Sequence, residues 1–299
     1  MGFFLFNQRS IRDPYTQIAW EEALALTMRK FGIKYGIRLW RNLPTLVLGI
    51  SEKENETIEN SYLNEFKFEF RKSYQSKLQS TPCNKKFPNL SSAWIVRRAS
   101  GGGTVFQNST SNLNFSLFLD IADKQELYPV QNSYNFLLGA VIQALAMQDI
   151  TAVSAGKSDL SIKMPNGSLR KISGNAQFRK KDMIVQHGTL ILDESLFQEI
   201  EKYQLHPPEE PDYRARRTHR DFLAAIESPL DENQFGLDLL NLLSQSKLAD
   251  LPQEKNSSLT SKNTPNTRQF AFLKESLRLR KTLMVQKYSD NNWLWKTEL

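Results

Sequence analysis

Two arginines followed by three glycines form the part of this chain whose residue types and spacing best suit anion chemistry. The stretch reads Arg97, Arg98, Ala99, Ser100, Gly101, Gly102 and Gly103. Glycine backbone lets a ligand approach closely, and its N–H groups can meet anionic oxygens. The arginine guanidinium groups supply paired donors that match phosphate or carboxylate. The pattern therefore indicates an anion-binding loop, although a glycine-rich turn or a β-bulge would contain the same residues.

A lysine further along the chain could provide a second positive charge. If Leu169–Ser173 is a strand, Lys171 points to the same side as Ser173 and away from Ile172. Burying an ammonium group without a partner is costly, so an inward-facing lysine would mark a site. A lone lysine that faces solvent would carry no such meaning.

Other patterns that could bind phosphate or metal are incomplete. Gly156–Ser158 resembles the end of a phosphate loop, but Thr151 stands where that loop needs glycine. The single cysteine, Cys83, excludes a disulfide within the chain and a thiolate zinc site, and the three histidines lack metal-ligand spacing. Gln186–Thr189 places small and polar residues within a strand-like run, which favours a ligand on that face. His187 in this run could be structural or catalytic.

Composition and charge narrow the class of protein. The 299 residues are 40% hydrophobic and 24% charged, which is typical of a globular chain with one large domain or one plus a small one. The net charge of +7 favours an anionic cofactor, an acidic protein or a nucleic acid as partner. Arg214–Arg217 is the one compact basic run, so nucleic acid is not favoured. Without a membrane-length apolar run or a signal peptide, we expect a cytoplasmic protein and no membrane partner.

Strands and helices alternate around the candidate residues. The expected strands are Tyr35–Trp40, Thr45–Ile50, Trp94–Val96, Leu113–Leu119, Asp159–Lys163, Leu169–Ser173 and Met183–Leu192, with Leu113–Leu119 half-buried. The expected helices begin at Asp13-Pro14, Gln131, Thr218 and Ser228-Pro229, and the one that begins at Thr218 runs through Ile226. Residues 52–92 are polar and lack periodicity, so we expect a loop or ragged insertion. Residues 250–267 are expected to be a linker, and the state of the tail from Phe270 is left open.

Four ordered motifs resemble the signature of the lipoate-protein ligase family. They are Arg97–Phe106 followed by Asn112–Asn114, then Gly156–Leu160, Lys171–Gln177 and His187–Leu190. The last three are similar to the family patterns G-R-N-D-[LI], K-[IF]-[SA]-G-[SN]-A-Q and H-G-T-L. Each motif alone is weak, but four in order are specific. The similarity covers about Ile11–Ile226, including Glu21–Leu24 and Trp40–Gly49.

The resemblance implies a fold and a division into parts. The fold would be the α/β (α+β) arrangement of the biotin/lipoate ligases, with a mixed, largely antiparallel sheet flanked by helices. Residues 1–226 would form the catalytic domain, interrupted by the polar insertion at 52–92. Residues 227–299 would form a C-terminal helical extension that does not resemble the accessory domain of full-length ligases.

The resemblance also implies an activity. Family members use ATP and Mg²⁺ to convert lipoate to lipoyl-AMP, and then attach the lipoyl group to a lysine of an acceptor lipoyl domain. The acceptors belong to E2 subunits of 2-oxoacid dehydrogenases or are the glycine cleavage H protein. A chain without the accessory domain could instead be a lipoyltransferase that uses preformed lipoyl-AMP or needs a separate accessory subunit. Acceptor domains are acidic around their target lysine, so a net charge of +7 suits electrostatic steering of the encounter.

Site residues carry over by position in the motifs. Lys171 would be the catalytic lysine that contacts both the lipoate carboxylate and the nucleotide phosphate, where a desolvated ammonium stabilises developing charge. Asp159 would lie near the nucleotide and is a candidate Mg²⁺ contact. The other residues expected to line the nucleotide and lipoyl pocket are Arg98, Ser100, Gly101, Gly102, Gly103, Thr104, Val105, Phe106, Asn112, Ser173, Gly174, Ala176, His187, Gly188 and Thr189.

The sequence departs from the family pattern at a few positions. Gln107-Asn108 stands where many members have His-Asp, and Ser158 stands where asparagine is usual. These changes keep open a non-catalytic homologue that binds lipoate or nucleotide. The related octanoyl transferases use a cysteine nucleophile, and Cys83 lies far from the motifs. The G-R-G-R-x-x-x-R loop of biotin ligases is absent from the glycine stretch.

Overall fold

A seven-stranded sheet runs through the centre of the molecule. The computed structural model describes residues 2–8, 10–77, 93–245 and 267–296. The strand order is β1 (Phe3–Asn7), β2 (Tyr35–Trp40), β6 (Asn112–Asp120), β10 (Met183–Ile191), β9 (Leu169–Lys180), β8 (Asp159–Lys163) and β7 (Val153–Ala155). Strands β1 and β2 pair in parallel, and the other neighbours pair antiparallel. The expected mixed, largely antiparallel sheet is confirmed.

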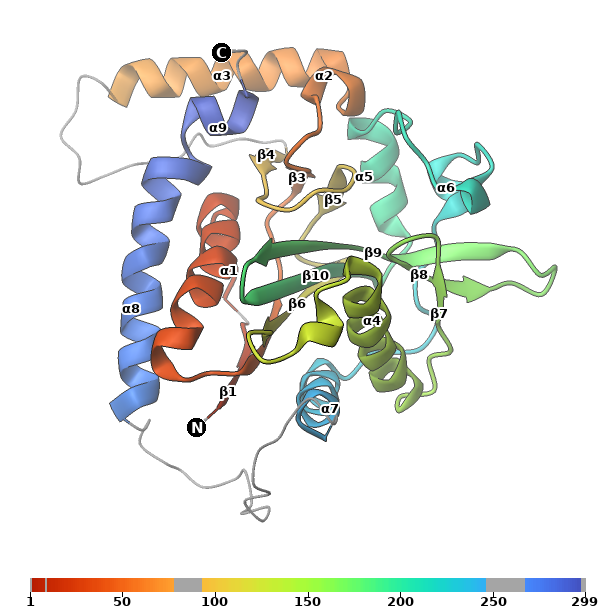
Figure 1. Cartoon of the computed structure of the whole chain (residues 1–299). Helices are drawn as coiled ribbons and strands as arrows, with labels where there is room; N and C mark the ends of the chain where they lie inside the picture. The colour runs from red at the N-terminus through yellow and green to blue at the C-terminus, as the bar shows by residue number, and fades with distance from the viewer. Residues whose placement is uncertain (1, 9, 78–92, 246–266, 297–299) are drawn as a thin grey trace.

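A smaller sheet carries the glycine stretch. Its order is β4 (Trp94–Arg97), β3 (Thr45–Leu48) and β5 (Val105–Gln107), and β3 is parallel to β4 but antiparallel to β5. The glycines therefore lie in the connection between the two outer strands of this sheet. Figure 1 shows the small sheet beside the ends of β6, β9 and β10.

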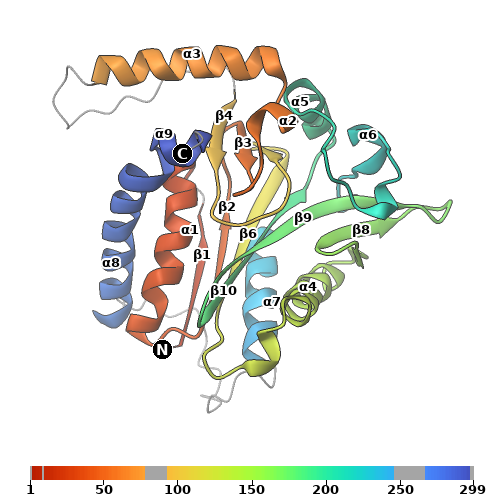
Figure 2. The ribbon, with the colours of Figure 1, turned by 45° about the horizontal axis from the view of Figure 1, so that its top comes forward.

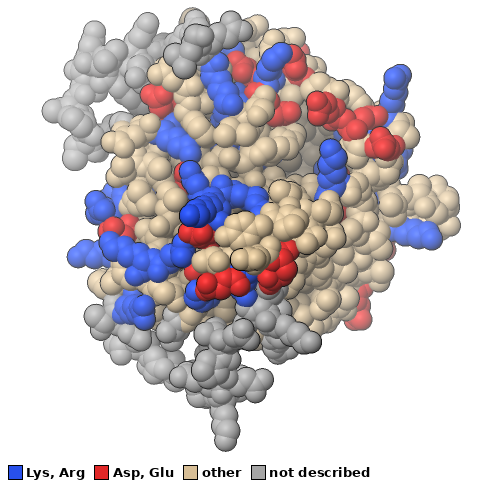
Figure 3. All heavy atoms as spheres, viewed as in Figure 1, with Lys and Arg blue, Asp and Glu red and all other residues tan. Residues whose placement is uncertain are grey.

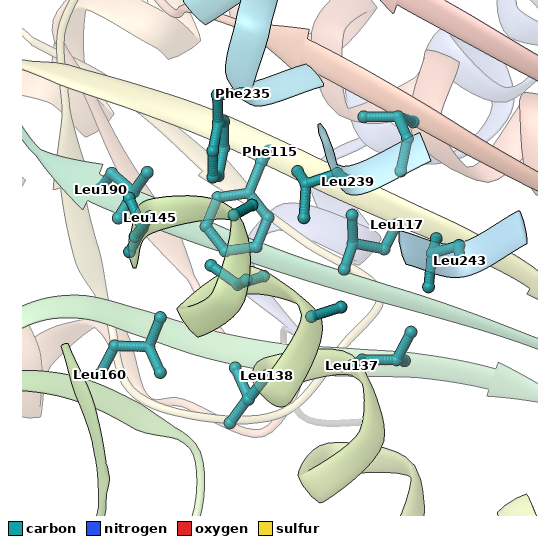
Figure 4. Close-up of a cluster of buried hydrophobic side chains, with 14 of the residues drawn as sticks. Phe115, Leu117, Leu137, Leu138, Leu145, Leu160, Leu190, Phe235, Leu239 and Leu243 are labelled. Atoms are coloured by element: carbon teal, nitrogen blue, oxygen red, sulfur yellow. The ribbon is translucent and has the colours of Figure 1, made fainter. Parts of the chain in front are cut away.

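Helices cover both faces of the large sheet (Figure 2). Helices α1 (Pro14–Met28) and α8 (Thr267–Leu283) lie on one face, and α4 (Val130–Ala146) and α7 (Glu232–Gln245) lie on the other. Figure 4 shows the second of these layers, where leucines of α4 and α7 and Phe235 of α7 pack on Phe115, Leu117 and Leu190 of the sheet. Burial of this apolar surface is the main source of stability in a fold of this kind.

Because both faces are covered, strand β6 is buried throughout. The expectation of a half-buried strand was therefore wrong. Its polar residues are satisfied inside the protein, since Ser116 Oγ donates to Glu21 Oε1 over 2.6 Å and accepts from Trp40 Nε1 over 3.0 Å. The polar residues that alternate along this strand therefore face a buried hydrogen-bond network and not solvent.

The expectation of a loop at 52–92 was also wrong as far as residue 77. The chain forms α2 (Glu54–Thr57) and α3 (Asn60–Lys77), while residues 78–92 lie outside the described part of the chain. In α3, Tyr62 and Phe66 are one helical turn apart and both are buried. Their rings pack against Tyr203 and Trp295 with centroids 4.6 and 6.1 Å apart. Packing by these two aromatic side chains, together with the buried Leu63, stabilises a helix that is rich in polar residues.

The helix caps expected at Asp13 and Thr218 are confirmed, whereas other expected boundaries differ. The Asp13 carboxylate accepts from Thr16 N over 2.9 Å at the start of α1, and Thr218 Oγ1 accepts from Asp221 N over 3.2 Å at the start of α6 (His219–Phe222). Helix α6 stops at Phe222, before the expected end at Ile226, and α7 begins at Glu232 rather than after Pro229. Strand β9 continues to Lys180, beyond the expected end at Ser173.

The remaining helical elements are short. They are η1 (Arg29–Phe31), η2 (Gln125–Leu127), α5 (Ser195–Tyr203), η3 (Asp212–Arg214), the π-helical turn η4 (Met284–Tyr288) and α9 (Asn291–Trp295). Helix α8 runs along α1 and leads through η4 to α9, beside β4 (Figures 1 and 2). Most of the expected linker at 250–267 lies outside the described residues. Within the described ranges, no helix has the length and apolar character needed to cross a membrane.

Candidate active site

The glycine stretch forms a loop with one tightly packed residue and two open ones. Gly102 has a φ of +84°, a left-handed conformation that favours glycine, and its carbonyl oxygen would lie 1.9 Å from a Cβ at Gly49. By contrast, nothing lies within 4 Å of a Cβ added at Gly101 or Gly103. Gly102 therefore fixes the loop against the β3 end, while Gly101 and Gly103 leave room for a ligand.

Arg98 organises this loop from behind. Its buried guanidinium donates from Nε to Ser100 Oγ over 2.9 Å, and from Nη2 to the carbonyl oxygens of Gly101 and Gly103 over 2.6 and 2.9 Å. Burial lowers the pKa of Arg98 to about 10, opposed by the nearby carboxylates of Glu52 and Glu21. Arg98 thus binds the carbonyl oxygens of the two open glycines and fixes the loop backbone. Its expected contact with the nucleotide stays a prediction.

Arg97 does not offer donors to a ligand. The side chain is 0% exposed and donates from Nη1 to the carbonyl oxygens of Gly49 and Glu52 over 2.8 and 2.7 Å. The expectation that both arginines face an anion is therefore wrong for Arg97. Adjacent strand residues point to opposite sides, and only one of the two can face the loop.

Glu52 holds the far end of the loop. One oxygen of its carboxylate accepts from the backbone N of Thr104 over 2.9 Å and from Thr104 Oγ1 over 2.7 Å. Sequence reasoning missed Glu52, because it placed this residue at the start of a polar insertion. No local pattern connects it with Thr104, which is 52 residues away.

A chain of hydrogen bonds connects the loop to helix α1. Ser100 Oγ lies 2.7 Å from His187 Nε2, and His187 Nδ1 lies 2.7 Å from Glu21 Oε2. Burial by itself would raise the pKa of Glu21, but the His187 imidazole, the Ser116 hydroxyl and the Arg38 charge lower it below its ordinary value. The chain fixes the imidazole between a carboxylate and the loop serine. Glu21 was part of the family resemblance but not of the expected site. The signal available in the sequence was a pair of carboxylates within the otherwise apolar stretch Ile18–Leu26.

A β-bulge in β9 decides which way Lys171 points. Leu160 pairs with Ser173 and Ser161 pairs with Lys171, so Ile172 is the extra residue. Because paired residues share a face and consecutive β8 residues do not, Lys171 and Ser173 lie on opposite faces. The expectation that they point the same way was wrong for this reason.

The bulge places Lys171 beside Asp159. Lys171 Nζ lies 2.9 Å from Asp159 Oδ1, and its side chain is 23% exposed. The lysine also folds over Gly174, where an added Cβ would lie 2.9 Å from Nζ. The interpretation of Lys171 as an ordinary solvent-facing lysine is therefore not supported, since the ammonium is paired and largely covered.

Tyr213 binds the other oxygen of Asp159. Its hydroxyl donates to Asp159 Oδ2 over 2.9 Å, and burial, together with the Asp159 charge, raises the pKa of Tyr213. Tyr213 also borders an open groove of about 820 Å³ between the β8–β9 turn and α6. Sequence reasoning missed this tyrosine, because its segment has no regular periodicity and lies 54 residues from Asp159.

The glycine loop and strand β9 meet at Ala176. A Cβ on Gly102 would lie 3.7 Å from Ala176 Cβ, and Ala176 is paired with His187 across β9 and β10. The structure therefore brings the glycine loop, Ala176 and His187 together. Lys171 is on the same strand as Ala176, beyond Gly174.

Other expected residues make contacts that support the site from within the protein. Because Gly188 has no side chain, Asn175 and Phe115 can pack against its backbone; a Cβ there would lie 2.0 Å from Asn175 Oδ1 and 2.4 Å from the Phe115 ring. Thr189 Oγ1 accepts from Gln107 Nε2 over 3.0 Å and donates to Asn114 Oδ1 over 2.9 Å. These contacts join β5 to β6 and β10.

Asn112, Ser173, Val105 and Phe106 are likewise placed by packing or backbone contacts. Asn112 Oδ1 accepts from the backbone N of Asn108 over 2.7 Å, Ser173 is 0% exposed, and Val105 pairs with Val47 in the small sheet. Phe106 is buried and stacks on Tyr203 with ring centroids 5.6 Å apart. Contact of these residues with a ligand stays a prediction.

Known proteins match most of this chain. The family model for the lipoyl protein ligase A/B catalytic domain matches residues 13–235. Over 191 residues the chain is 30% identical to the probable lipoate-protein ligase A of Mycoplasma genitalium, which covers 64% of this chain and 46% of that protein. Lipoate-protein ligase LplJ of Bacillus subtilis is 29% identical over 193 residues, with the same two coverages. The chain thus spans about half the length of the curated relatives it matches.

Solved structures share the fold over nearly the whole chain. The bi-partite lipoate protein ligase of Thermoplasma acidophilum has a TM-score of 0.65 at 18% identity, covering 98% of this chain and 95% of that chain. Lipoate-protein ligase A bound with ATP has a TM-score of 0.64 at 16% identity, covering 99% of each chain. Together with the match to the family model, the ordered motifs and the fold show that this chain belongs to the lipoyl protein ligase A/B catalytic domain family.

Proposed function

We propose that this chain is an ATP-dependent lipoate-protein ligase, which activates lipoate as lipoyl-AMP and transfers the lipoyl group to a lysine of an acceptor lipoyl domain. The observation that carries this proposal is the position of Lys171. This lysine lies on the strand that meets the glycine loop and is paired with Asp159. Two solved relatives add support, since one is described with ATP bound and another with lipoic acid bound. We assign the reaction to residues 1–226 and to the cytoplasm, where ATP is available.

The first step joins two anions, and the site supplies the positive charge that this step needs. A carboxylate oxygen of lipoate attacks the α-phosphorus of ATP, and the bond from that phosphorus to the bridging oxygen of pyrophosphate breaks. The Lys171 ammonium between the carboxylate and the α-phosphate would stabilise the negative charge that develops there. Holding both reactants in place also removes much of the entropic cost of their encounter.

The second step uses the same lysine. The amine of the acceptor lysine attacks the acyl carbon, AMP leaves with the carboxyl oxygen, and the attacking nitrogen loses a proton to form the amide. Lys171 would polarise the acyl carbonyl, and the glycine loop would shield the mixed anhydride from water. No covalent nucleophile from the protein is required.

Mg²⁺ would neutralise part of the triphosphate charge, and Asp159 is the candidate protein ligand. Mg²⁺ is commonly bound through one or two carboxylates together with substrate phosphates, so one acidic residue at the site fits such an ion. Both Asp159 oxygens already have a hydrogen-bonded partner, but each carboxylate oxygen has a second acceptor position. Among the residues that the structure describes, no three Asp, Glu, His or Cys side chains converge to form a metal centre on their own.

The proposed partners are acidic lipoyl domains, from E2 subunits or the glycine cleavage H protein. One solved relative is described together with its E2 lipoyl domain. On the face shown in Figure 3, lysine and arginine side chains gather on the side where α1 and α8 lie. With a net charge of +7, this surface would speed the encounter with an acidic domain, so the acceptor KM should rise with salt. A separate accessory subunit is a further candidate partner.

A two-arm assay tests the proposal. In the first arm the chain receives lipoate, ATP, Mg²⁺ and an acceptor lipoyl domain, and in the second it receives synthetic lipoyl-AMP and the same domain. A ligase adds the lipoyl mass in both arms. Modification in the second arm alone would make the chain a lipoyltransferase, and no modification in either arm would leave a binding protein.

A further inference from the structure

In two pairs of adjacent residues, one side chain points toward the site and the other contacts the C-terminal helices. In α1, Glu21 reaches the site through His187, whereas Glu22 is bound by η4. At the end of β4, Arg98 holds the glycine loop, whereas Arg97 is bound by α9. The C-terminal segment thus contacts the back of both elements that carry the loop and its hydrogen-bond chain.

The contact with β4 is made of hydrogen bonds in both directions. Trp293 Nε1 donates to the carbonyl oxygen of Arg97 over 2.9 Å, and Arg97 Nε donates to the carbonyl oxygen of Leu294 over 2.9 Å. The same guanidinium binds the carbonyl oxygen of Glu52, whose carboxylate holds Thr104 at the end of the glycine loop. A continuous path of hydrogen bonds therefore leads from α9 to both ends of the loop.

The contact with α1 is equally buried. Glu22 Oε2 accepts from Tyr288 OH over 2.5 Å and from Lys287 Nζ over 2.7 Å. Tyr288 is 1% exposed, and burial together with the Glu22 charge raises its pKa. Lys287 Nζ also lies 4.3 Å from the centroid of the Trp293 ring, which ties η4 to α9.

We propose that the turn Lys287–Leu294 positions the active site, with Trp293 as the positioning residue for the glycine loop through Arg97. The role in catalysis rests on the proposed ligase function, whereas the effect on the loop does not. Lys287, Tyr288, Trp293 and Leu294 make their hydrogen bonds to Glu22 and Arg97, so the effect would be carried by the buried Arg97 guanidinium and the backbone beside Arg98.

Matched substitutions in α9 test this inference. Trp293→Phe keeps an aromatic ring but removes the N–H that binds Arg97. Trp295→Phe is the control, because the ring of this tryptophan packs on Phe66 and Lys67 of α3. Tyr288→Phe removes the hydroxyl that binds Glu22 and serves as the second test variant if Trp293→Phe does not fold.

Backbone amide exchange of residues 98–106 is the readout that does not depend on activity. Loss of one hydrogen bond of this kind changes an opening equilibrium by about fivefold, so these amides should exchange about fivefold faster in Trp293→Phe than in wild type. Trp295→Phe should match wild type in the exchange of this segment. The two tryptophan variants should show similarly small changes in Tm. Equal exchange in the two tryptophan variants would overturn the inference.

Kinetics then separate the inference from the proposed function. In an active wild type, Trp293→Phe should raise the KM for lipoate by at most about fivefold, with a smaller change in kcat, because the fraction of molecules with a formed loop falls. If wild type does not modify the acceptor at all, the proposed function fails, while the exchange result still decides whether α9 positions the loop.

Discussion

The Lys171 ammonium lies 2.9 Å from Asp159 Oδ1, and a one-residue bulge at Ile172 makes this contact possible. Without the extra residue, the lysine would face the side of Ser173, toward the α4 and α7 layer. The bulge turns it to the side that carries Gly174 and Asp159. A bulge of this kind re-aims a side chain at a functional site.

Replacing Lys171 should abolish acyl transfer and leave the fold intact. We expect Lys171→Ala to reduce the rate of lipoyl transfer by at least about a hundredfold, since one preorganised charge is commonly worth that much. Lys163→Ala, at the exposed end of the neighbouring strand, is the control. The modified acceptor can be quantified by mass spectrometry, with circular dichroism as the check on folding. Turnover near that of wild type would remove Lys171 from the site.

Glu52 should act through the two bonds it accepts from Thr104. Glu52→Ala removes both, so we expect the efficiency with lipoate, kcat/KM, to fall about tenfold. Glu52→Gln keeps one acceptor oxygen and should lie much closer to wild type. Steady-state kinetics on the three proteins make the comparison. Equal losses in both variants would show that the charge, and not the hydrogen bonds, matters.

Two glycine substitutions should separate folding from ligand binding. A methyl group at Gly188 would lie 2.0 Å from Asn175 Oδ1, so Gly188→Ala should destabilise the protein by about 2 kcal/mol. A Cβ added at Gly103 would have no neighbour within 4 Å, so Gly103→Ala should change the free energy of unfolding by less than about 0.5 kcal/mol. The same methyl should weaken lipoate binding about tenfold if a ligand occupies that space. Urea denaturation and calorimetric titration measure the two quantities; unchanged affinity in Gly103→Ala would place the ligand elsewhere.

The pH dependence of stability should reflect Glu21. Its folded pKa is below its ordinary value of 4.5, so the ionised carboxylate stabilises the native state. This stabilisation is fully present above the unfolded pKa and is lost as the pH falls through the folded pKa. The free energy of unfolding of wild type should therefore drop between about pH 5 and pH 3, and the drop should be smaller in Glu21→Gln.

An exposed glutamate provides the comparison for this experiment. Glu126 lies in η2 and is solvent-exposed, so Glu126→Gln should retain the wild-type pH dependence. Urea denaturation at several pH values gives the required free energies. Identical pH dependence in Glu21→Gln and wild type would mean that the His187 contact does not lower the pKa of Glu21.

Local sequence patterns predicted much of the fold because their causes are local. The Asp13 cap, the glycine run and the apolar helix at Val130–Ala146 each depend on residues a few positions apart. The ordered motifs also indicated that the glycine stretch and the Lys171 strand belong to one site. In the structure the two meet where Gly102 approaches Ala176.

Features that depend on distant contacts could not be predicted in this way. The α3 helix is stabilised by aromatic packing on Tyr203 and Trp295, which no pattern within residues 52–92 reveals. The bulge at Ile172 is a matter of strand register, which the pairing with β8 sets. Tyr213 and the C-terminal turn reach the site from segments that are far away in sequence.

Lipoate-dependent exchange of labelled pyrophosphate into ATP tests most directly whether Lys171 brings a carboxylate and an α-phosphate together. The isolated wild-type chain should catalyse this exchange with lipoate present and not without it, and Lys171→Ala should show none. Exchange by the variant at the wild-type rate, or none by wild type under conditions in which it binds both ligands, would contradict the account.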